Sequence, residues 1–196
     1  MAIDFGEHPT PPASYRLPVL FTYPRVLLAI LSGIALLVSL LVFGALLWLL
    51  QGQPGQFQIV LRPIDGVVVL LTIPGTVLAH EAIHGALLRL LGYRPTFGID
   101  LRMPAAYAVA PGQFQTRDHF LVVALAPLVV ITVGMVPLLA IQNSTIGSIA
   151  FTALLMNTSG AVGDLLIAWR VVRLPRAALL CDISPERVLI YEPDLQ

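Results

Sequence analysis

The sequence has little of what a soluble enzyme or a nucleic-acid-binding protein needs. Only 11% of its 196 residues are charged, lysine is absent, and eleven Arg side chains are balanced by eleven Asp and Glu side chains. Without net charge or a basic cluster, we expect no nucleic-acid partner. The single cysteine, Cys181, cannot form an internal disulfide, and it also excludes a cysteine-based zinc site. Any metal ion must therefore be held by His and carboxylate side chains.

Apolar residues take the place of the missing charge and make up 57% of the chain. A soluble domain of this length needs more polar surface, so the composition predicts an α-helical integral membrane protein. We interpret residues 1–196 as a single membrane domain. Four apolar runs are long enough to cross a bilayer, at residues 26–50, 66–91, 120–141 and 146–172.

The stretch between the second and third runs, at about 95–111, is broken by prolines and glycines. Residues 96–101 and 105–110 predict the two strands of a membrane-associated β-hairpin, since open strand edges are tolerated there if they line a cavity. Pro74 and Gly75 predict a kink or local unwinding within the second helix. The tail is short and amphiphilic, and residues 188–191 predict a final strand, whereas residues 1–24 are proline-rich and predict an irregular segment.

Arginines are distributed unevenly over the ends of the four runs. They gather before the first run, between the second and third, and after the fourth; Arg62 alone separates the first two runs, and none separates the last two. The positive-inside rule then predicts that both termini and the hairpin are cytoplasmic.

The second run contains the sequence His80-Glu81-Ala82-Ile83-His84. Residues four apart share a helix face, so both imidazoles can bind one zinc ion while Glu81 stands beside a metal-bound water as the catalytic base. Ionisable groups are costly in a membrane span and usually mark a function. The alternative, two histidines hydrogen-bonded for packing, leaves Glu81 unexplained.

A catalytic zinc ion needs three protein ligands and one open position. From the cytoplasmic helix ends, His84 lies at a depth of about 12 Å, His80 at about 18 Å, and Asp164 of the fourth run at about 15 Å. Asp164 is therefore the expected third ligand, with His119 or Asp100 next in line. Asn157 lies two turns from Asp164, too far for the same ion; it either contacts a substrate carbonyl or oxyanion, or bonds across helices.

The order of HExxH helix, hairpin, plain helix, and helix with Asn157 and Asp164 resembles the core of the site-2-protease intramembrane metalloproteases. Residues 66–164, with the tail, are similar to a family of small bacterial membrane proteins described as zincin-type peptidases. The chain departs from site-2 proteases in the order Gly163-Asp164 and in lacking proline between Asn157 and Asp164.

The resemblance implies one zinc ion per chain and a place in a bacterial cell membrane. It also implies Glu81 as general base and acid, and a hairpin that presents an unfolded substrate strand. The expected function is zinc-dependent intramembrane cleavage of a membrane-protein or peptide substrate in the lipid bilayer. The alternatives are a catalytically inactive metal-binding scaffold or regulator and a haem or ion carrier. The substrate and the oligomeric state are not specified by the sequence.

Overall fold

The computed structural model describes residue 10 and residues 13–51, 63–100 and 105–194. Its contacts divide into two compact units, which we describe separately. The first unit contains residues 1–25, 81–126 and 163–196, and the second contains residues 26–80 and 127–162. The boundaries at 80/81 and 126/127 fall inside helices, so the HExxH motif lies where one helix passes from the second unit into the first.

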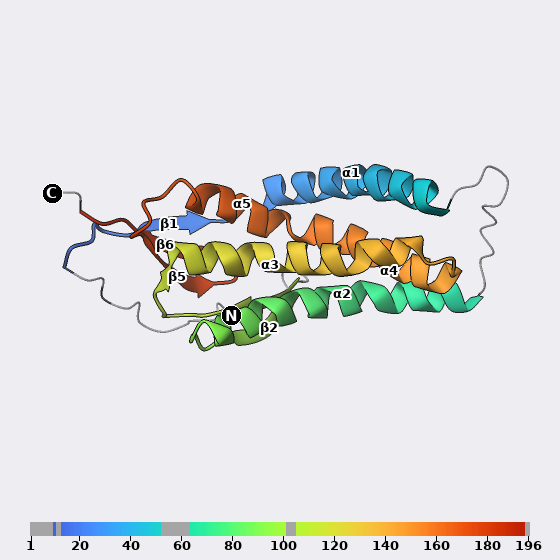
Figure 1. Ribbon diagram of the computed structural model, residues 1–196. Coiled ribbons are helices and arrows are strands. Elements are labelled where there is room, and N and C mark those ends of the chain that lie inside the picture. The colour runs from blue at the N-terminus through green and yellow to red at the C-terminus, as the bar shows by residue number, and fades with distance from the viewer. Residues whose placement is uncertain (1–9, 11–12, 52–62, 101–104, 195–196) are drawn as a thin grey trace. The chain divides into compact units, whose positions relative to one another are not determined.

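The described chain is mostly helical (Figure 1). Three helices are long and apolar enough to cross a membrane, and there are four such spans if a bent pair of helices is counted as one. The expected spans at 26–50 and 66–91 correspond to the first two helices. The helices are α1 (Arg25–Gln51), α2 (Pro63–Leu90), α3 (Arg117–Met135) with the 3₁₀ helix η1 (Val136–Ala140), and the bent pair α4 (Ser144–Gly160) and α5 (Val162–Val171).

The break between α4 and α5 corrects the expected single helix over 146–172. The α-helix is interrupted at Ala161, although the Ala161 N–H still donates to the Asn157 carbonyl. Gly160 and Gly163 flank the break, and glycine lowers the cost of leaving a helix because its backbone is the least restricted. As a result, Asp164 lies in the first turn of a new helix and not in the middle of a long one.

The local unwinding expected at Pro74 is absent, because α2 continues through Pro74 and Gly75 without a break. Proline removes one backbone donor, which membrane helices tolerate when nearby hydroxyls re-engage carbonyl groups. Two hydroxyls bond to carbonyls on either side of the one that Pro74 releases, which is that of Leu70: Thr72 donates to the Val68 carbonyl at 2.7 Å, and Thr76 donates to the Thr72 carbonyl at 2.8 Å.

In the second unit, α1, η1 and α4 share a buried apolar cluster around Leu139 and Leu154. Polar contacts fix the ends of these elements. Gln51, the last residue of α1, donates to the Leu139 carbonyl at 2.7 Å, and Thr145 donates to Asp65 of α2 at 2.9 Å.

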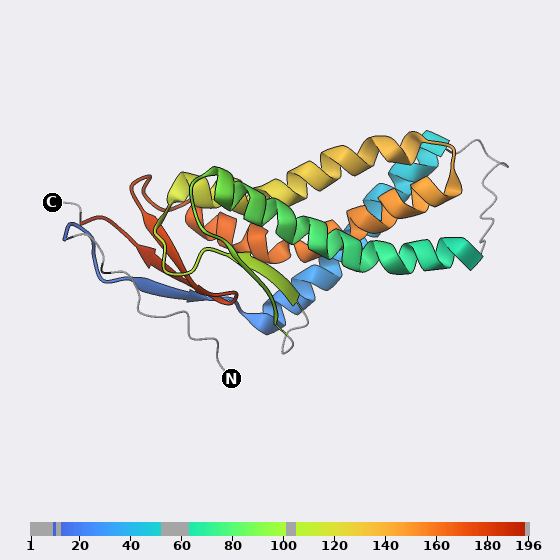
Figure 2. The ribbon, with the colours of Figure 1, turned by 90° about the horizontal axis from the view of Figure 1, so that it is seen from below.

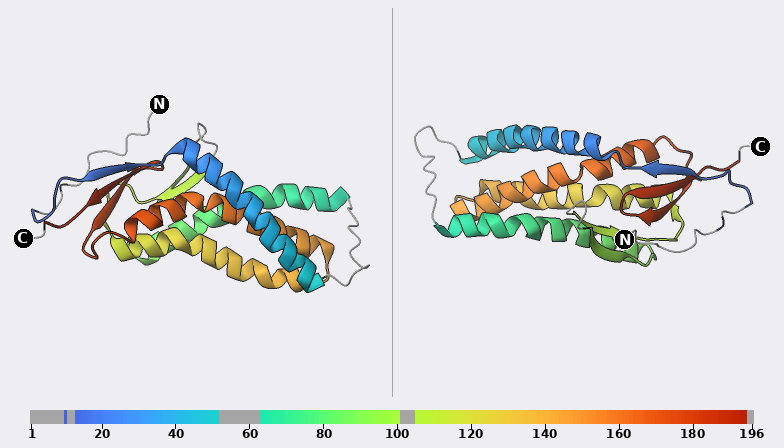
Figure 3. Two further views of the ribbon diagram at one scale, coloured as in Figure 1. Left: turned by 90° about the horizontal axis from the view of Figure 1, so that it is seen from above. Right: turned by 180° about the vertical axis from the view of Figure 1, so that it is seen from behind.

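The first unit contains a four-stranded antiparallel sheet in the order β1-β6-β5-β4 (Figure 2, Figure 3). Its strands are β1 (Val19–Thr22), β4 (Gln115–Thr116), β5 (Leu179–Ser184) and β6 (Arg187–Tyr191). The strand expected at 188–191 is confirmed as β6. The expectation of an irregular N-terminal segment is wrong for residues 19–22, because they pair with β6 from Val19 opposite Ile190 to Thr22 opposite Arg187.

The sheet packs on helices of its own unit through a buried cluster that includes Ile167 and Val171 of α5 and Leu180 and Ile190 of the sheet. The start of α1 is tied to the β5–β6 turn, where Arg25 Nη2 lies 2.7 Å from a Glu186 carboxylate oxygen. The sheet and α5 therefore pack against each other, and Asp164 lies in this α5 helix.

The hairpin expected between the second and third helices is present. Strands β2 (Thr96–Asp100) and β3 (Ala105–Val109) pair antiparallel, with Phe97 opposite Ala108 and Gly98 opposite Tyr107. The expected turn at 102–104 and the expected strand end at 101 lie outside the described residues. The pairing leaves one edge of each strand without a neighbouring strand within the described part of the chain.

Candidate metal and catalytic site

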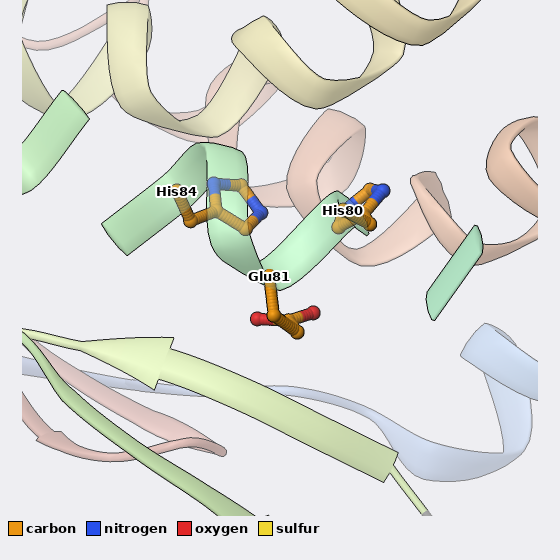
Figure 4. Close-up of side chains that lie close together, drawn as sticks. All are labelled: His80, Glu81 and His84. Atoms are coloured by element: carbon orange, nitrogen blue, oxygen red, sulfur yellow. The ribbon is translucent and has the colours of Figure 1, made fainter. Parts of the chain in front are cut away.

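The HExxH residues come from two successive turns of α2 (Figure 4). His80, Glu81 and His84 each offer a ligand atom, and these atoms lie within 4.8 Å of one another. Both histidines are buried, and Glu81 is partly exposed. Figure 4 shows the Glu81 carboxylate directed toward strand β3, away from the two imidazole rings. The cluster can hold a metal ion.

The orientation of His84 is set by a main-chain acceptor in α3. Its Nδ1 lies 2.9 Å from the Val123 carbonyl oxygen, which can only accept a hydrogen bond. Nδ1 therefore carries a proton and donates, and in the neutral imidazole Nε2 is the atom with the lone pair that a metal ligand needs. The same Nε2 lies 3.6 Å from Asp164 Oδ1.

Pro127 explains why the Val123 carbonyl is available to His84. In an α-helix the N–H of residue i donates to the carbonyl of residue i−4, and residue 127 would donate to residue 123. Proline has no N–H, so α3 makes no such bond at this position although the helix continues through it. The proline thus releases one backbone acceptor at the turn that faces His84. Pro127 is evident in the sequence, but its effect on His84 could not be seen there because His84 lies on another helix.

His80 is oriented in the same way by a side chain. Its Nδ1 lies 3.0 Å from Oδ1 of Asn157, and the Asn157 amide nitrogen donates to the Leu128 carbonyl at 3.4 Å. The second bond assigns the amide oxygen to His80, so Nδ1 of His80 is the donor and Nε2 again carries the lone pair. Asn157 is almost fully buried. Asn157 thus forms the interhelical bond that was one of its two expected roles.

The distance between His84 and Asp164 is one that two ligands of a single metal ion can have, although the three ligand atoms within 4.8 Å of one another belong to His80, Glu81 and His84. Two ligands that bind a tetrahedral zinc ion at about 2.0 to 2.2 Å lie roughly 3.4 Å apart, close to the observed 3.6 Å. Asp164 is partly buried and follows Gly163, where an added Cβ would lie 3.9 Å from the Tyr23 ring, an ordinary contact. The chemistry of the donor set, two imidazoles and a carboxylate, suits zinc.

The other sequence candidates lie elsewhere or outside the described side chains. The His119 Nδ1 pairs with the Tyr93 hydroxyl at 2.9 Å, and the two rings meet edge to face at the start of α3. This contact gives His119 a structural role. Asp100 lies in β2, but its side chain is not among those described.

Asp182 is a buried carboxylate that sequence reasoning missed. Its Oδ2 accepts hydrogen bonds from the Ala110 N–H at 3.0 Å and from Gln115 Nε2 at 2.8 Å. Burial raises the pKa of Asp182 above its usual value, and these two hydrogen bonds offset part of the rise. Asp182 therefore ties the end of the hairpin to β5. The sequence signal was weak, because a single Asp in an amphiphilic tail is ordinarily a surface residue.

An HExxH motif on one helix, with His80, Glu81 and His84 close enough to hold a metal ion, is typical of zincin-type metallopeptidases. The chain belongs to the family described as "putative zincin peptidase", which matches residues 73–179 and therefore more than half of the sequence. The match extends from α2, through the hairpin, to the first residue of β5. Neither a curated protein nor a solved structure matches the chain.

Proposed function

We propose that this protein is a zinc-dependent endopeptidase that cleaves a peptide bond of a membrane-embedded substrate. The observation that carries the proposal is the matched orientation of the two histidines. Each Nδ1 lies at hydrogen-bond distance from a fixed oxygen acceptor, so in the neutral ring Nε2 is the nitrogen able to bind a metal ion. Two histidines hydrogen-bonded only for packing would not account for a carboxylate 3.6 Å from one Nε2 or for Glu81 within 4.8 Å of both rings.

The proposed ligands are His80, His84 and Asp164, with one zinc ion per chain. Zinc held by these residues would lower the pKa of a water molecule and polarise the substrate carbonyl. Glu81 would accept a proton from the attacking water and pass it to the leaving amine. Asn157 and the Val123 carbonyl hold the imidazole rings in place, and they contact no reacting atom in this scheme.

Glu81 is assigned to proton transfer although distance alone would allow it to bind the metal. Position i+1 of a helix points away from the face shared by positions i and i+4. Figure 4 supports this assignment, because the carboxylate lies on the hairpin side of α2. A substrate strand placed against the hairpin would then pass close to the base.

The hairpin is proposed to hold the substrate in an extended form. The backbone of a transmembrane helix is paired internally, so its carbonyls must be exposed before hydrolysis. Addition of an unwound segment to an open edge of β2 or β3 would replace the lost helical hydrogen bonds with strand pairing.

Four spans are proposed, with α4 and α5 counted as one bent span, and both termini and the hairpin are placed in the cytoplasm. Exposed positions at opposite helix ends, Gln142 and Asp118, suit cysteine labelling. A membrane-impermeant maleimide should label a cysteine at 142 from outside the cell and should label one at 118 only after permeabilisation. The opposite pattern would refute the orientation.

The enzymatic proposal is tested by comparing Glu81→Gln with the wild type in detergent. Both should contain about one zinc ion per chain, and only the wild type should cleave a transmembrane peptide in liposomes, at a bond within its apolar segment. Asp118→Asn, a change at an exposed carboxylate, serves as the control and should leave cleavage intact. Loss of zinc in Glu81→Gln would contradict the assigned role. Zinc-loaded wild-type protein that cleaves no peptide would favour the inactive scaffold.

A further inference from the structure

Strand β2 meets helix α2 closely at a glycine. The ring of Phe97 lies so close to Gly85 that a Cβ at position 85 would overlap ring carbons Cζ and Cε1. Arg89 also lies over this ring, with its Cζ 5.7 Å from the ring centre. The ring is therefore in contact with two residues of α2 that are one turn apart.

These contacts lie on the same helix face as the proposed catalytic base. Glu81, Gly85 and Arg89 are spaced four residues apart and form one stripe along α2. Gly85 and Arg89 hold the hairpin, and the Glu81 carboxylate points toward β3 one turn earlier (Figure 4). The position of the Phe97 ring thus sets how far the hairpin lies from Glu81.

The face of the hairpin that carries Phe97 is otherwise lined with small residues on β3. Phe97 pairs with Ala108 and Ile99 pairs with Ala106, so these four side chains share one face of the two-stranded sheet. On that face Phe97 is the aromatic side chain, and it is the one that reaches α2 at Gly85. The side chain that meets α2 at Gly85 is therefore also the largest on this face.

We propose that Gly85 and Phe97 are positioning residues that fix the substrate-binding hairpin at a set distance from Glu81. This inference rests on the proposed peptidase function. It adds that α2 determines both where the metal is bound and where the substrate strand lies. Any side chain at position 85 displaces the ring, and with it the strand edges, without touching a proposed metal ligand.

The test compares Gly85→Ala with Gly75→Ala, a change at a glycine of the same helix where an added Cβ would have no neighbour within 4 Å. Both changes replace a helical glycine by alanine, so the difference between them isolates the Phe97 contact. Three quantities are measured on the full-length protein in detergent: bound zinc, hydrogen exchange of the hairpin amides, and kcat/KM for fluorescent β-casein, an unfolded chain.

We expect Gly85→Ala to retain its zinc, to exchange the amides of β2 and β3 about tenfold faster, and to lose about tenfold in kcat/KM. Gly75→Ala should match the wild type in all three. The double variant Gly85→Ala/Phe97→Leu should recover part of both losses, because leucine lacks the ring carbons that would overlap the new methyl group. If Gly85→Ala does not fold, Phe97→Ala carries the same expectation of faster exchange with zinc retained.

Equal exchange and equal kcat/KM in the two glycine variants would overturn the inference, as would zinc loss in Gly85→Ala or a double variant no better than Gly85→Ala. Faster exchange with unchanged kcat/KM would also overturn it. Failure of the proposed function has a different signature. Zinc-loaded wild type would then leave casein intact, while hairpin exchange in Gly85→Ala would still show whether the anchor exists.

Discussion

Replacement of Pro127 by alanine should move zinc affinity and helix stability in opposite directions. Alanine restores an N–H that can donate to the Val123 carbonyl within α3. The carbonyl would then be shared between this N–H and His84 Nδ1, which now bonds to it at 2.9 Å. His84 would be held less firmly in the orientation that offers Nε2 to the metal.

The magnitude of each effect follows from the local structure. Loss of an outer hydrogen bond to a metal-binding histidine typically weakens metal binding by about 10- to 100-fold. A carbonyl has two lone pairs and can keep part of the bond to His84, so we expect zinc binding about 3- to 10-fold weaker. Alanine gains about 3 kcal/mol in helix preference over an interior proline. Pro127 is fully buried, and the loss of its ring packing offsets about 1 to 2 kcal/mol of that gain.

The assay measures zinc affinity by competition with a chelator, and unfolding of the zinc-free protein by heat in the same detergent. Pro74→Ala is the matched control, because Pro74 is an exposed proline inside α2 and the carbonyl that it releases belongs to Leu70. The control should gain helix stability without a change in zinc affinity. If Pro127→Ala binds zinc as tightly as Pro74→Ala, the Val123 carbonyl does not position His84 and the reasoning is refuted.

Three further outcomes test other parts of the structure. Asp164→Ala should lose zinc as completely as removal of either histidine, and full zinc occupancy in this variant would exclude Asp164 as a ligand. Asp182 has a raised pKa in the folded state, so its contribution to stability is present below its ordinary pKa of 3.8 and is lost as the pH rises through the raised value. Asp182→Asn should remove this pH dependence of the unfolding free energy measured in urea. An unchanged dependence on pH would contradict the raised pKa of Asp182. Cys181 is fully buried and its pKa is raised to about 11, so it should react with maleimide only after denaturation, and labelling of the native protein would contradict the packing of β5.

The local parts of the site could be predicted from the sequence. The HExxH spacing specifies one helix face within five residues, and Asp164 was selected because it is a carboxylate in an apolar run at the depth of the histidines. The hairpin was also a local signal, with two short runs separated by a proline-containing turn. Each of these predictions depends on residues close in sequence, or on one distance along a helix.

The four-stranded sheet could not be predicted as a whole, because β1 pairs with β6 and β4 with β5 across long stretches of the sequence. Val19 pairs with Ile190, and the sequence of neither segment indicates that the two strands will pair. Residues 19–22 follow a proline-rich stretch that favours an irregular reading, and pairing with β6 overrides that local preference. The break at Ala161 was hidden for a similar reason, since an apolar run with two glycines is compatible with either a straight or a broken helix.

The two groups that orient the histidines could not be predicted equally well from the sequence, because one is a side chain and the other is a main-chain carbonyl. Asn157 stood out because an amide in an apolar run must find a partner, and it does so at His80. The acceptor for His84 is a main-chain carbonyl, which every residue possesses, so nothing in the sequence at Val123 itself indicates the contact. The sequence signal lies four residues later, at Pro127. A proline inside a buried helix identifies the carbonyl at i−4 as one without its helical donor, and a buried acceptor of this kind requires another donor. Each such proline in a membrane helix therefore specifies where a donor from elsewhere in the fold is needed, and in this protein the donor is a proposed metal ligand.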